Sequence, residues 1–155
     1  SLKKSKNFDL RIESGRRYLE NFWEILTQNL RLNFKVDPVH NISEIKYLEN
    51  LFKENIECIV CLNNDKVIAG VLLFKTNTVI HTQYIASNEE GKSICALDYL
   101  FDYLIKRSIE KDYYWLNFGI STEENGFVLN NNLYNFKTEF GAGSTLYNTY
   151  QVEFK

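Results

Sequence analysis

The spacing of apolar residues changes along the chain, and each change predicts a different structural element. Residues 7–13 alternate apolar and polar side chains well enough for a short strand. Apolar side chains then recur every three or four residues over 14–30, and again after Asn41, which predicts two helices. Pro38, the only proline, separates these helices, and Asn41 and Glu44 have the spacing of a helix capping box.

Three apolar segments come next, at residues 56–63, 66–76 and 78–86. Links of two or three residues join them, which predicts three strands in an antiparallel meander. The second segment is apolar at consecutive positions from Val67 to Phe74. A strand of that composition is buried on both faces, so helices are expected to cover both sides of the sheet.

A helix and a further strand follow the meander. The apolar stripe of this helix consists of Ile94, Leu97, Phe101, Leu104 and Ile105. Ser93 is expected to cap the helix, and residues 113–118 form the strand. A strand, a helix and a second strand make a right-handed crossover with parallel strands. Residues 79–86 should therefore lie beside residues 113–118 and parallel to them.

The chain ends with a shorter predicted helix at 130–140 and a closing strand at 145–154. The expected order is therefore β-α-α-β-β-β-α-β-α-β. This order indicates an α/β fold with a mixed sheet, formed by an antiparallel meander and one parallel crossover, with helices on both faces. The length suits a single domain over residues 1–155 with a full hydrophobic core.

Composition limits the function classes. The 155 residues carry 20 acidic and 18 basic side chains, for a net charge of −2, and both signs are dispersed along the chain. No nucleic-acid partner is expected, because nucleic-acid binding needs a concentrated basic stripe. No membrane span is expected, since no apolar run approaches the roughly 20 residues that cross a bilayer. No metal site is expected either, because the ligand types do not cluster.

The three cysteines include a C-x-x-C spacing at Cys58 and Cys61. This spacing binds metal or does redox chemistry when a turn or a helix start brings the two sulfurs together. Here it lies inside a predicted strand, where residues three apart point to opposite faces. Both are therefore interpreted as buried structural thiols. Cys95, near a helix start, is interpreted as a residue that packs, with a reactive thiolate as the weaker alternative. Reduced thiols favour a cytoplasmic location.

The polar residues 88–93 lie where the meander gives way to the crossover. Ligands in open α/β sheets favour such a point, outside the carboxyl ends of the strands. Gly91 permits a backbone geometry that other residues resist, Lys92 adds positive charge, and a helix start offers N–H groups. These features suit a pyrophosphate. The alternative is a solvated turn, which Glu89 and Glu90 favour because their charges repel phosphate.

The whole order of strands and helices resembles the GNAT superfamily of acyl-CoA-dependent N-acyltransferases. The pyrophosphate loop of that family follows the pattern Q/R-x-x-G-x-G/A, and this sequence has Asn88-x-x-Gly91-x-Ser93 at that place. The resemblance implies acetyl-CoA or another acyl-CoA as co-substrate. The loop residues that it implies as ligands of the pyrophosphate are Asn88, Gly91, Lys92 and Ser93.

The fourth and fifth strands of GNAT-like folds splay apart, and backbone of the fourth strand pairs with the acyl-pantetheine arm. The residues that this implies for the arm are Gln83, Ile85 and Ala86. The segment from Phe118-Gly119 to Phe136-Lys137-x-x-Phe140-Gly141 is also similar to Fem-type and cell-envelope-associated GNAT-like domains. Fem-type enzymes use aminoacyl-tRNA, so a tRNA-linked donor is the one nucleic-acid partner that the resemblance leaves open.

Acyl transfer to an amine requires groups that move protons and hold the acceptor. His81 is a candidate base because an imidazole exchanges protons near neutral pH. Tyr84 is a candidate proton donor, and Glu123, just past the fifth strand, is a candidate base or substrate ligand. Lys137 can hold an anionic acceptor as a point charge. Asn130 is the second candidate for binding the acceptor, and with Leu133 it resembles the N-x-x-L pattern that precedes the Phe136-Lys137 motif in the family. The structural alternatives are packed side chains for His81 and Tyr84 and solvated ones for Glu123 and Lys137.

The sequence therefore predicts an acyl-CoA-dependent N-acyltransferase that acts on an amino group of a small molecule by direct attack within a ternary complex. An amino sugar or a cell-envelope precursor is the expected acceptor. Two alternatives stay open, namely a Fem-like aminoacyl transferase and a non-catalytic binding module that keeps the GNAT fold. The sequence also leaves open whether the chain forms a homodimer.

Overall fold

The computed structural model of the chain describes residues 8–146 and 148–154. Internal contacts divide the chain into two compact units, with the boundary between Gly119 and Ile120. The larger unit contains the sheet, and each unit is described in turn below.

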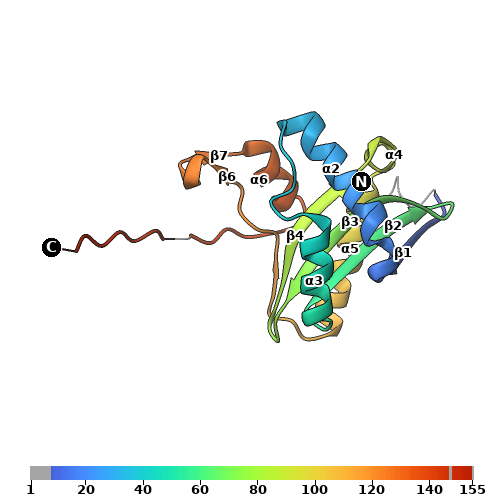
Figure 1. Cartoon of the computed structure of the whole chain (residues 1–155), viewed down its shortest axis with the longest axis horizontal. Coiled ribbons are helices and arrows are strands. Elements are labelled where there is room, and N and C mark those ends of the chain that lie inside the picture. The colour runs from blue at the N-terminus through green and yellow to red at the C-terminus, as the bar shows by residue number, and fades with distance from the viewer. Residues whose placement is uncertain (1–7, 147, 155) are drawn as a thin grey trace. The chain divides into compact units, whose positions relative to one another are not determined.

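The larger unit is built on a five-stranded sheet in the order β1-β2-β3-β4-β5 (Figure 1). The strands are β1 (Leu10–Ser14), β2 (Ile56–Asn63), β3 (Lys66–Lys75), β4 (Val79–Ser87) and β5 (Trp115–Asn117). The first four pair antiparallel. β5 lies parallel to β4, with Val79 opposite Trp115 and His81 opposite Asn117. The mixed sheet and its parallel crossover are thus confirmed, although β1 begins three residues later than predicted and Asn7 lies outside the described residues.

Helices cover both faces of this sheet, as predicted (Figure 1). They are α2 (Leu19–Phe34), which follows the short 3₁₀ helix η1 (Arg16–Tyr18), α3 (Ile42–Leu51), α4 (Glu89–Ser93) and α5 (Ala96–Glu110). α2 packs against β3 and β4 and α3 packs against β2, whereas α5 covers the opposite face. The side chains of Asn41 and Glu44 form the predicted capping box at the start of α3.

The core lies on both sides of β3, whose residues 67–73 are all buried. α2 can approach this strand closely because Gly70 has no side chain. A Cβ atom at Gly70 would lie 2.5 Å from Cδ2 of Phe22, a fully buried residue of α2. The α2 and α3 side of the core includes Leu19, Phe22, Trp23, Leu26, Ile45, Cys58, Val60, Leu62 and Leu72.

The helix after β4 differs from the prediction, because Ser93 is not its N-cap. The chain forms the five-residue helix α4, turns at Cys95 with a left-handed backbone, and then begins α5. The cap of α4 is Asn88, whose side chain accepts a hydrogen bond from the N–H of Gly91. The Ser93 hydroxyl instead donates to the carbonyl of Glu90, one turn earlier in the chain.

The smaller unit contains a two-stranded antiparallel ribbon followed by a helix. Its elements are β6 (Thr122–Glu123), the 3₁₀ turn η2 (Glu124–Gly126), β7 (Val128–Leu129) and α6 (Asn131–Thr138). The helix predicted at 130–140 is present as α6. The closing strand predicted at 145–154 is wrong for the described residues of that range, which form no strand, and Tyr147 lies outside them. A strand needs a partner, and an alternating apolar pattern does not provide one.

An ion-pair cluster joins α5 to the sheet. Glu57 of β2 accepts hydrogen bonds from Lys75 of β3 at 2.7 Å and from Arg107 of α5 at 2.9 Å, and all three side chains are largely buried. Burial raises the pKa of the Glu57 carboxyl, but the hydrogen bonds from Arg107 and Lys75 outweigh it and hold the pKa below its usual value. The folded state therefore favours the ionised carboxylate.

The C-x-x-C cysteines are buried free thiols, as predicted. Cys58 belongs to the core on the α2 and α3 side, and strand alternation turns Cys61 to the other face. Burial raises the pKa of both thiols to about 12, with the charges of Glu49 and Glu57 adding to the effect at Cys58. Neither group is suited to metal binding or redox chemistry, which need a thiolate.

We predict that a thiol reagent at neutral pH will label Cys95 in the native protein and will leave Cys58 and Cys61 unlabelled. Their modification should be slower by about 100-fold or more, because it requires opening of the core. Mass spectrometry of the digested protein measures this, with Cys95→Ser as the control. Fast labelling of Cys58 or Cys61 in that variant would contradict the described packing of β2.

We predict that Glu57→Gln will lower the free energy of unfolding at pH 7 by about 2 kcal/mol, because charged hydrogen bonds to two cations are lost. A carboxyl group whose pKa is lower in the folded state than in the unfolded state stabilises the fold at any pH above its unfolded-state pKa. This stabilisation is lost as the pH falls through the folded-state pKa. The difference between wild type and variant should therefore shrink towards zero at about pH 3. Urea denaturation at both pH values measures it, and a difference independent of pH would contradict the ion-pair account.

Candidate functional site

The strands β4 and β5 separate after three paired residues. Their parallel pairing ends at His81 and Asn117, whereas β4 continues to Ser87. Beyond His81, no strand of the described residues pairs with β4 on the side away from β3. The Thr82 hydroxyl spans the beginning of the gap by donating to the carbonyl of Asn117 at 3.1 Å. The carboxyl half of β4 therefore has one open edge.

A β-bulge lies where this edge begins. Leu72 of β3 pairs with Tyr84, but the next residue, Leu73, pairs with Thr82, so Gln83 is an extra residue in β4. An extra residue kinks a strand and reverses the alternation of its side chains. Residues opposite each other in an antiparallel pair share a face.

The bulge brings His81 and Tyr84 to the same face of the sheet, although residues three positions apart in a regular strand point to opposite faces. His81 lies opposite Phe74 and Tyr84 lies opposite Leu72. Phe74 and Leu72 both belong to the core on the α2 and α3 side. Two of the three predicted catalytic side chains therefore share the face that α2 and α3 cover.

The hydrogen bonds of the β3–β4 ladder determine which backbone groups point to the open edge. The N–H of Asn88 donates to the carbonyl of Ile68 at 3.0 Å. Because bonded pairs alternate in an antiparallel ladder, the backbone groups of Ala86 face β3, and those of Ile85 and Ser87 face away from it. Of the residues predicted to bind an acyl arm, Ile85 thus presents its backbone groups to the open edge. Gln83 forms the bulge, and the backbone groups of Ala86 face β3.

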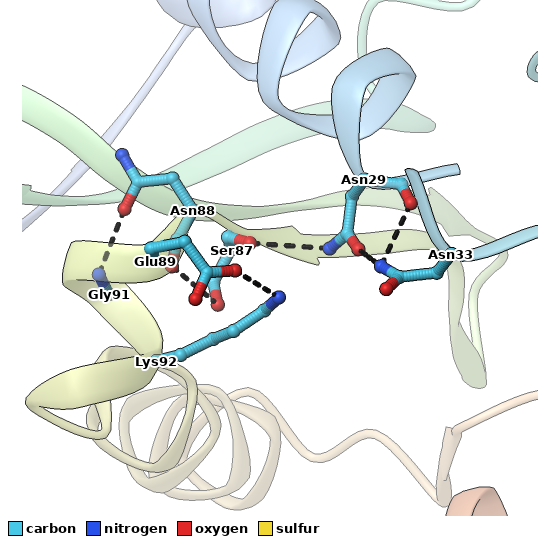
Figure 2. A network of polar contacts seen from close by, with 7 residues as sticks. All are labelled: Asn29, Asn33, Ser87, Asn88, Glu89, Gly91 and Lys92. Atoms are coloured by element: carbon cyan, nitrogen blue, oxygen red, sulfur yellow. Dashed lines mark hydrogen bonds and ion pairs between the residues drawn. The ribbon is translucent and has the colours of Figure 1, made fainter. Parts of the chain in front are cut away.

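The carbonyl of Ser87, at the far end of this edge, accepts a hydrogen bond from the side chain of Asn29 in α2 at 3.2 Å. Asn33, one turn later, donates to the backbone and side-chain oxygens of Asn29 (Figure 2). These two asparagines therefore fix the end of β4 to α2. Nothing in their spacing along the sequence indicates this role.

The polar loop after β4 satisfies its own hydrogen bonds (Figure 2). The N–H of Gly91 donates to the side chain of Asn88 at 2.9 Å, and the N–H of Lys92 donates to the Asn88 carbonyl at 2.9 Å. The Lys92 ammonium pairs with Glu89 at 2.6 Å. Two N–H groups that the sequence assigned to a pyrophosphate thus have partners inside the loop, and a ligand would have to replace these bonds.

Gly91 is required because of close packing and not, as predicted, because of an unusual backbone geometry. Its φ is not in the left-handed region, which among the glycines contains only Gly15, Gly119, Gly126 and Gly141. A Cβ atom at Gly91 would lie 2.4 Å from the carbonyl oxygen of Ile68, which is backbone and cannot move aside. Glycine is therefore needed here for the close approach of α4 to β3, and its replacement would alter packing before it altered a ligand contact.

Tyr84 has a partner that the sequence did not indicate. Its hydroxyl lies 2.7 Å from Nδ1 of His40, in the loop between α2 and α3, and accepts a hydrogen bond from the His40 backbone N–H at 3.3 Å. Trp23 packs edge-on against the Tyr84 ring, with centroids 5.2 Å apart. The sequence does not indicate this contact, because no periodicity relates a loop residue to a strand 44 positions away.

His81 lies next to the end of the Asn117-Phe118-Gly119 motif. Gly119 has a φ of +72°, and a Cβ atom there would lie 3.5 Å from Cε1 of His81. The Asn117 side chain accepts a hydrogen bond from the N–H of Gly119 at 2.7 Å, and Phe118 stacks on Phe101 of α5 with centroids 4.8 Å apart. This motif therefore holds the chain in place immediately after β5.

In the smaller unit, the predicted substrate residues hold the local fold together. Asn130 caps α6 by accepting from the N–H of Leu133 at 2.9 Å, and its amide donates to the Glu123 carboxylate at 2.6 Å. Lys137 is only 6% exposed and donates to the carbonyl of Ile120. Burial lowers the pKa of its ammonium group. Lys137 is therefore buried, and the alternative interpretation of Lys137 as a solvated surface side chain is wrong.

The larger unit thus combines an open strand edge with three groups that can exchange protons, namely the His40, His81 and Tyr84 side chains. Such groups suit general acid–base chemistry beside an extended ligand. Within residues 8–146 and 148–154, no three metal-ligating side chains gather into a possible metal site. In the same ranges, no helix combines the length and the apolar character that a bilayer span requires.

Solved structures share this fold. A possible acetyltransferase from Clostridium difficile 630 is 15% identical with a TM-score of 0.72, and the match covers 94% of this chain and 98% of that one. A ribosomal-protein-alanine N-acetyltransferase from Brucella melitensis biovar Abortus 2308 is 15% identical with a TM-score of 0.61, covering 94% and 99%. An aminoglycoside acetyltransferase, meta-AAC0020 from an uncultured soil metagenomic sample, in complex with sisomicin, is 14% identical with a TM-score of 0.67, covering 96% and 98%.

A search of curated proteins gave no match. A sequence profile of the acetyltransferase (GNAT) domain matches residues 1–137, which is most of the chain. The profile covers the five-stranded sheet, the bulge in β4 and the helices on both faces. On this evidence, the chain belongs to the acetyltransferase (GNAT) domain family.

Proposed function

We propose that the protein is an acyl-CoA-dependent N-acyltransferase that acylates an amino group of a small molecule by direct attack within a ternary complex. The observation that carries this proposal is the open edge of β4, which begins at the Gln83 bulge and ends at the Asn88 loop. An open edge can pair with the amide groups of an extended arm in the way that a further strand would.

At one end of this edge, the backbone can pair with an acyl-pantetheine arm. At the other end, a pyrophosphate would first have to displace a hydrogen bond within the loop. Ile85 offers backbone groups that point away from β3, beside the bulge at Gln83. At the loop, Asn88, Lys92 and Ser93 are the proposed pyrophosphate ligands, and the ligand would displace the bond between Asn88 and the Gly91 N–H. When bound, acyl-CoA supplies an activated acyl group, and the protein supplies orientation and proton transfer.

Tyr84 and His81 are the proposed proton-transfer groups of the larger unit. Both lie on the face of β4 that α2 and α3 cover, on either side of the bulge. A phenol can protonate the departing CoA sulfur, and an imidazole or a carboxylate can take the proton that an ammonium acceptor must first lose. Glu123 is the proposed carboxylate for that step.

An amino sugar or a cell-envelope precursor is the proposed acceptor. One structure with this fold is described as an aminoglycoside acetyltransferase in complex with sisomicin. The Phe136-Lys137-x-x-Phe140-Gly141 motif resembles a motif of Fem-type domains. Transfer of an aminoacyl group, in place of a simple acyl group, is therefore the alternative reaction that we propose. Asn130 and Lys137 remain the proposed acceptor ligands, although their local hydrogen bonds limit how far either can move.

A non-catalytic binding module is the second candidate function, and the loop after β4 favours it. The N–H groups of Gly91 and Lys92 already have partners, and Glu89 and Glu90 place negative charge in the first turn of α4. A protein that had lost acyl-CoA binding would keep the fold and need no free N–H groups at this position.

We predict that acetyl-CoA binds the protein and raises its thermal stability. At 100 times the Kd, the gain is about 2.7 kcal/mol. Lys92→Gln should weaken binding about fivefold, because it removes one positive charge near the pyrophosphate. Lys106→Gln on α5 is the matched control, since both lysines pair with a nearby carboxylate on their own helix. Calorimetry measures both, and no binding by the wild type would favour the non-catalytic module.

We predict that Glu123→Gln will lower kcat at neutral pH by about 100-fold, because this carboxylate is proposed to take the proton that an ammonium acceptor loses before the attack. The amide can still accept the hydrogen bond from Asn130, so the ribbon should keep its fold. Glu124→Gln, at the adjacent position, is the matched control and should leave kcat unchanged. The rate is measured with radiolabelled acetyl-CoA and a panel of amines, and equal rates for both variants would remove Glu123 from the mechanism.

A further inference from the structure

A histidine and a tyrosine join the loop at 35–41 to the bulged strand β4. The phenol oxygen of Tyr84 lies 2.7 Å from Nδ1 of His40, and the two rings are nearly perpendicular with centroids 6.0 Å apart. Both residues are only partly buried. The contact therefore lies at the border between the core and solvent, where a side chain can meet a ligand.

The hydrogen bonds of the phenol are compatible with donation from its O–H to Nδ1 of His40. A phenol has one O–H donor and two acceptor lone pairs. The backbone N–H of His40 occupies one lone pair at 3.3 Å. If the O–H donates to Nδ1, the second lone pair stays available to accept from the N–H of an incoming amine. Trp23 packs edge-on against the Tyr84 ring and restricts its rotation.

The loop does not depend on His40 for its shape. Arg31 at the end of α2 pairs with Asp37 at 2.5 Å. The Asn41 backbone N–H donates to the Glu44 carboxylate at 2.6 Å, and the Asn41 side chain accepts from the Glu44 N–H at 2.9 Å. These contacts anchor the loop on both sides of His40. Substitution of His40 is therefore expected to leave the fold intact.

We propose that Tyr84 and His40 form a proton relay for acyl transfer, in which Tyr84 touches the reacting amine and His40 holds the proton behind it. The inference rests on the proposed function and adds to it His40, a residue that lies outside the sequence motifs described above. His40 acts through Tyr84, so it is a positioning residue that also stores a proton. The Gln83 bulge matters because it turns Tyr84 to the face where the loop at 35–41 lies.

The relay conserves protons through one turnover. As the amine nitrogen bonds to the acyl carbon, the Tyr84 oxygen takes the proton that the nitrogen loses, and the phenol proton moves to Nδ1 of His40. As the carbon–sulfur bond breaks, the proton returns from Nδ1 through the phenol to the CoA sulfur. The products are an N-acyl amine and free CoA thiol, and the pair ends in its starting state.

The first test needs no substrate. The chain contains two histidines, so the imidazole ¹⁵N spectrum is simple, and a His81→Gln variant assigns it. Nδ1 of His40 should have the shift of an unprotonated nitrogen that accepts a hydrogen bond, and Tyr84→Phe should move this shift. A protonated Nδ1 at neutral pH, or a shift unchanged in Tyr84→Phe, would overturn the relay whether or not the protein is active.

The second test separates proton storage from positioning. In His40→Asn the side-chain oxygen can still accept from the phenol but cannot carry a proton, whereas His40→Ala loses both properties. The relay predicts that kcat falls about 100-fold in both variants and in Tyr84→Phe, with little change in KM for acetyl-CoA. Combining His40→Asn with Tyr84→Phe should cause no further loss, because the two residues act as a unit.

Tyr18→Phe is the matched control, since Tyr18 also packs against the core on the α2 and α3 side. It should retain the wild-type kcat. Full activity of His40→Asn with loss in His40→Ala would assign His40 to positioning alone and overturn the relay. Absence of acetyl transfer by the wild type to sisomicin, glucosamine and an alanyl peptide would overturn the proposed function and the relay with it, even if the ¹⁵N spectrum shows the bond.

Discussion

One extra residue in β4 determines the arrangement around the candidate site. Gln83 has no partner in β3, so the strand kinks between Thr82 and Tyr84 and its side-chain alternation reverses. Just before this bulge, at His81, the parallel pairing with β5 ends. The common face of His81 and Tyr84 and the contact with His40 follow from this irregularity, which lies beside the open edge. A regular strand would have turned Tyr84 to the other face of the sheet.

Two glycines allow helices to approach the sheet closely near this site. Gly70 leaves space for the ring of Phe22, so α2 lies close over β3, and Trp23 on the same helix reaches the Tyr84 ring. Gly91 lets α4 lie against the backbone of Ile68. Both positions would meet a steric conflict with any larger residue. The geometry of the candidate site is therefore a consequence of packing as much as of its polar residues.

Polar residues that look available in the sequence are largely engaged in the structure. The loop after β4 uses Asn88 to cap α4, and the N–H of Gly91 is the group that it binds. In the smaller unit, Asn130 caps α6 and Lys137 is buried against a carbonyl. Buried or terminal backbone groups require partners, and short polar side chains supply them at low cost. Any ligand of these segments therefore competes with an internal hydrogen bond.

The sequence by itself determined the order of the sheet strands from β1 to β5, the antiparallel meander and the parallel crossover, because these depend on local periodicity and on the length of the connections. It also identified Cys58 and Cys61 as structural thiols, since strand alternation points them to opposite faces of the sheet. It could not indicate that Ser93 would fail as a cap, because the left-handed turn at Cys95 that divides α4 from α5 has no signal in the apolar periodicity.

Only the tertiary structure decided which residues meet. The bulge at Gln83 is a property of two paired strands, so no pattern within β4 alone reveals it. His40 and Tyr84 are 44 positions apart and come together because α2 and α3 fold over the sheet. The alternation at 145–154 satisfied the local rule for a strand, but a strand also needs a neighbour with free backbone groups. Local periodicity therefore predicted the elements, and pairing and packing between distant segments made the site.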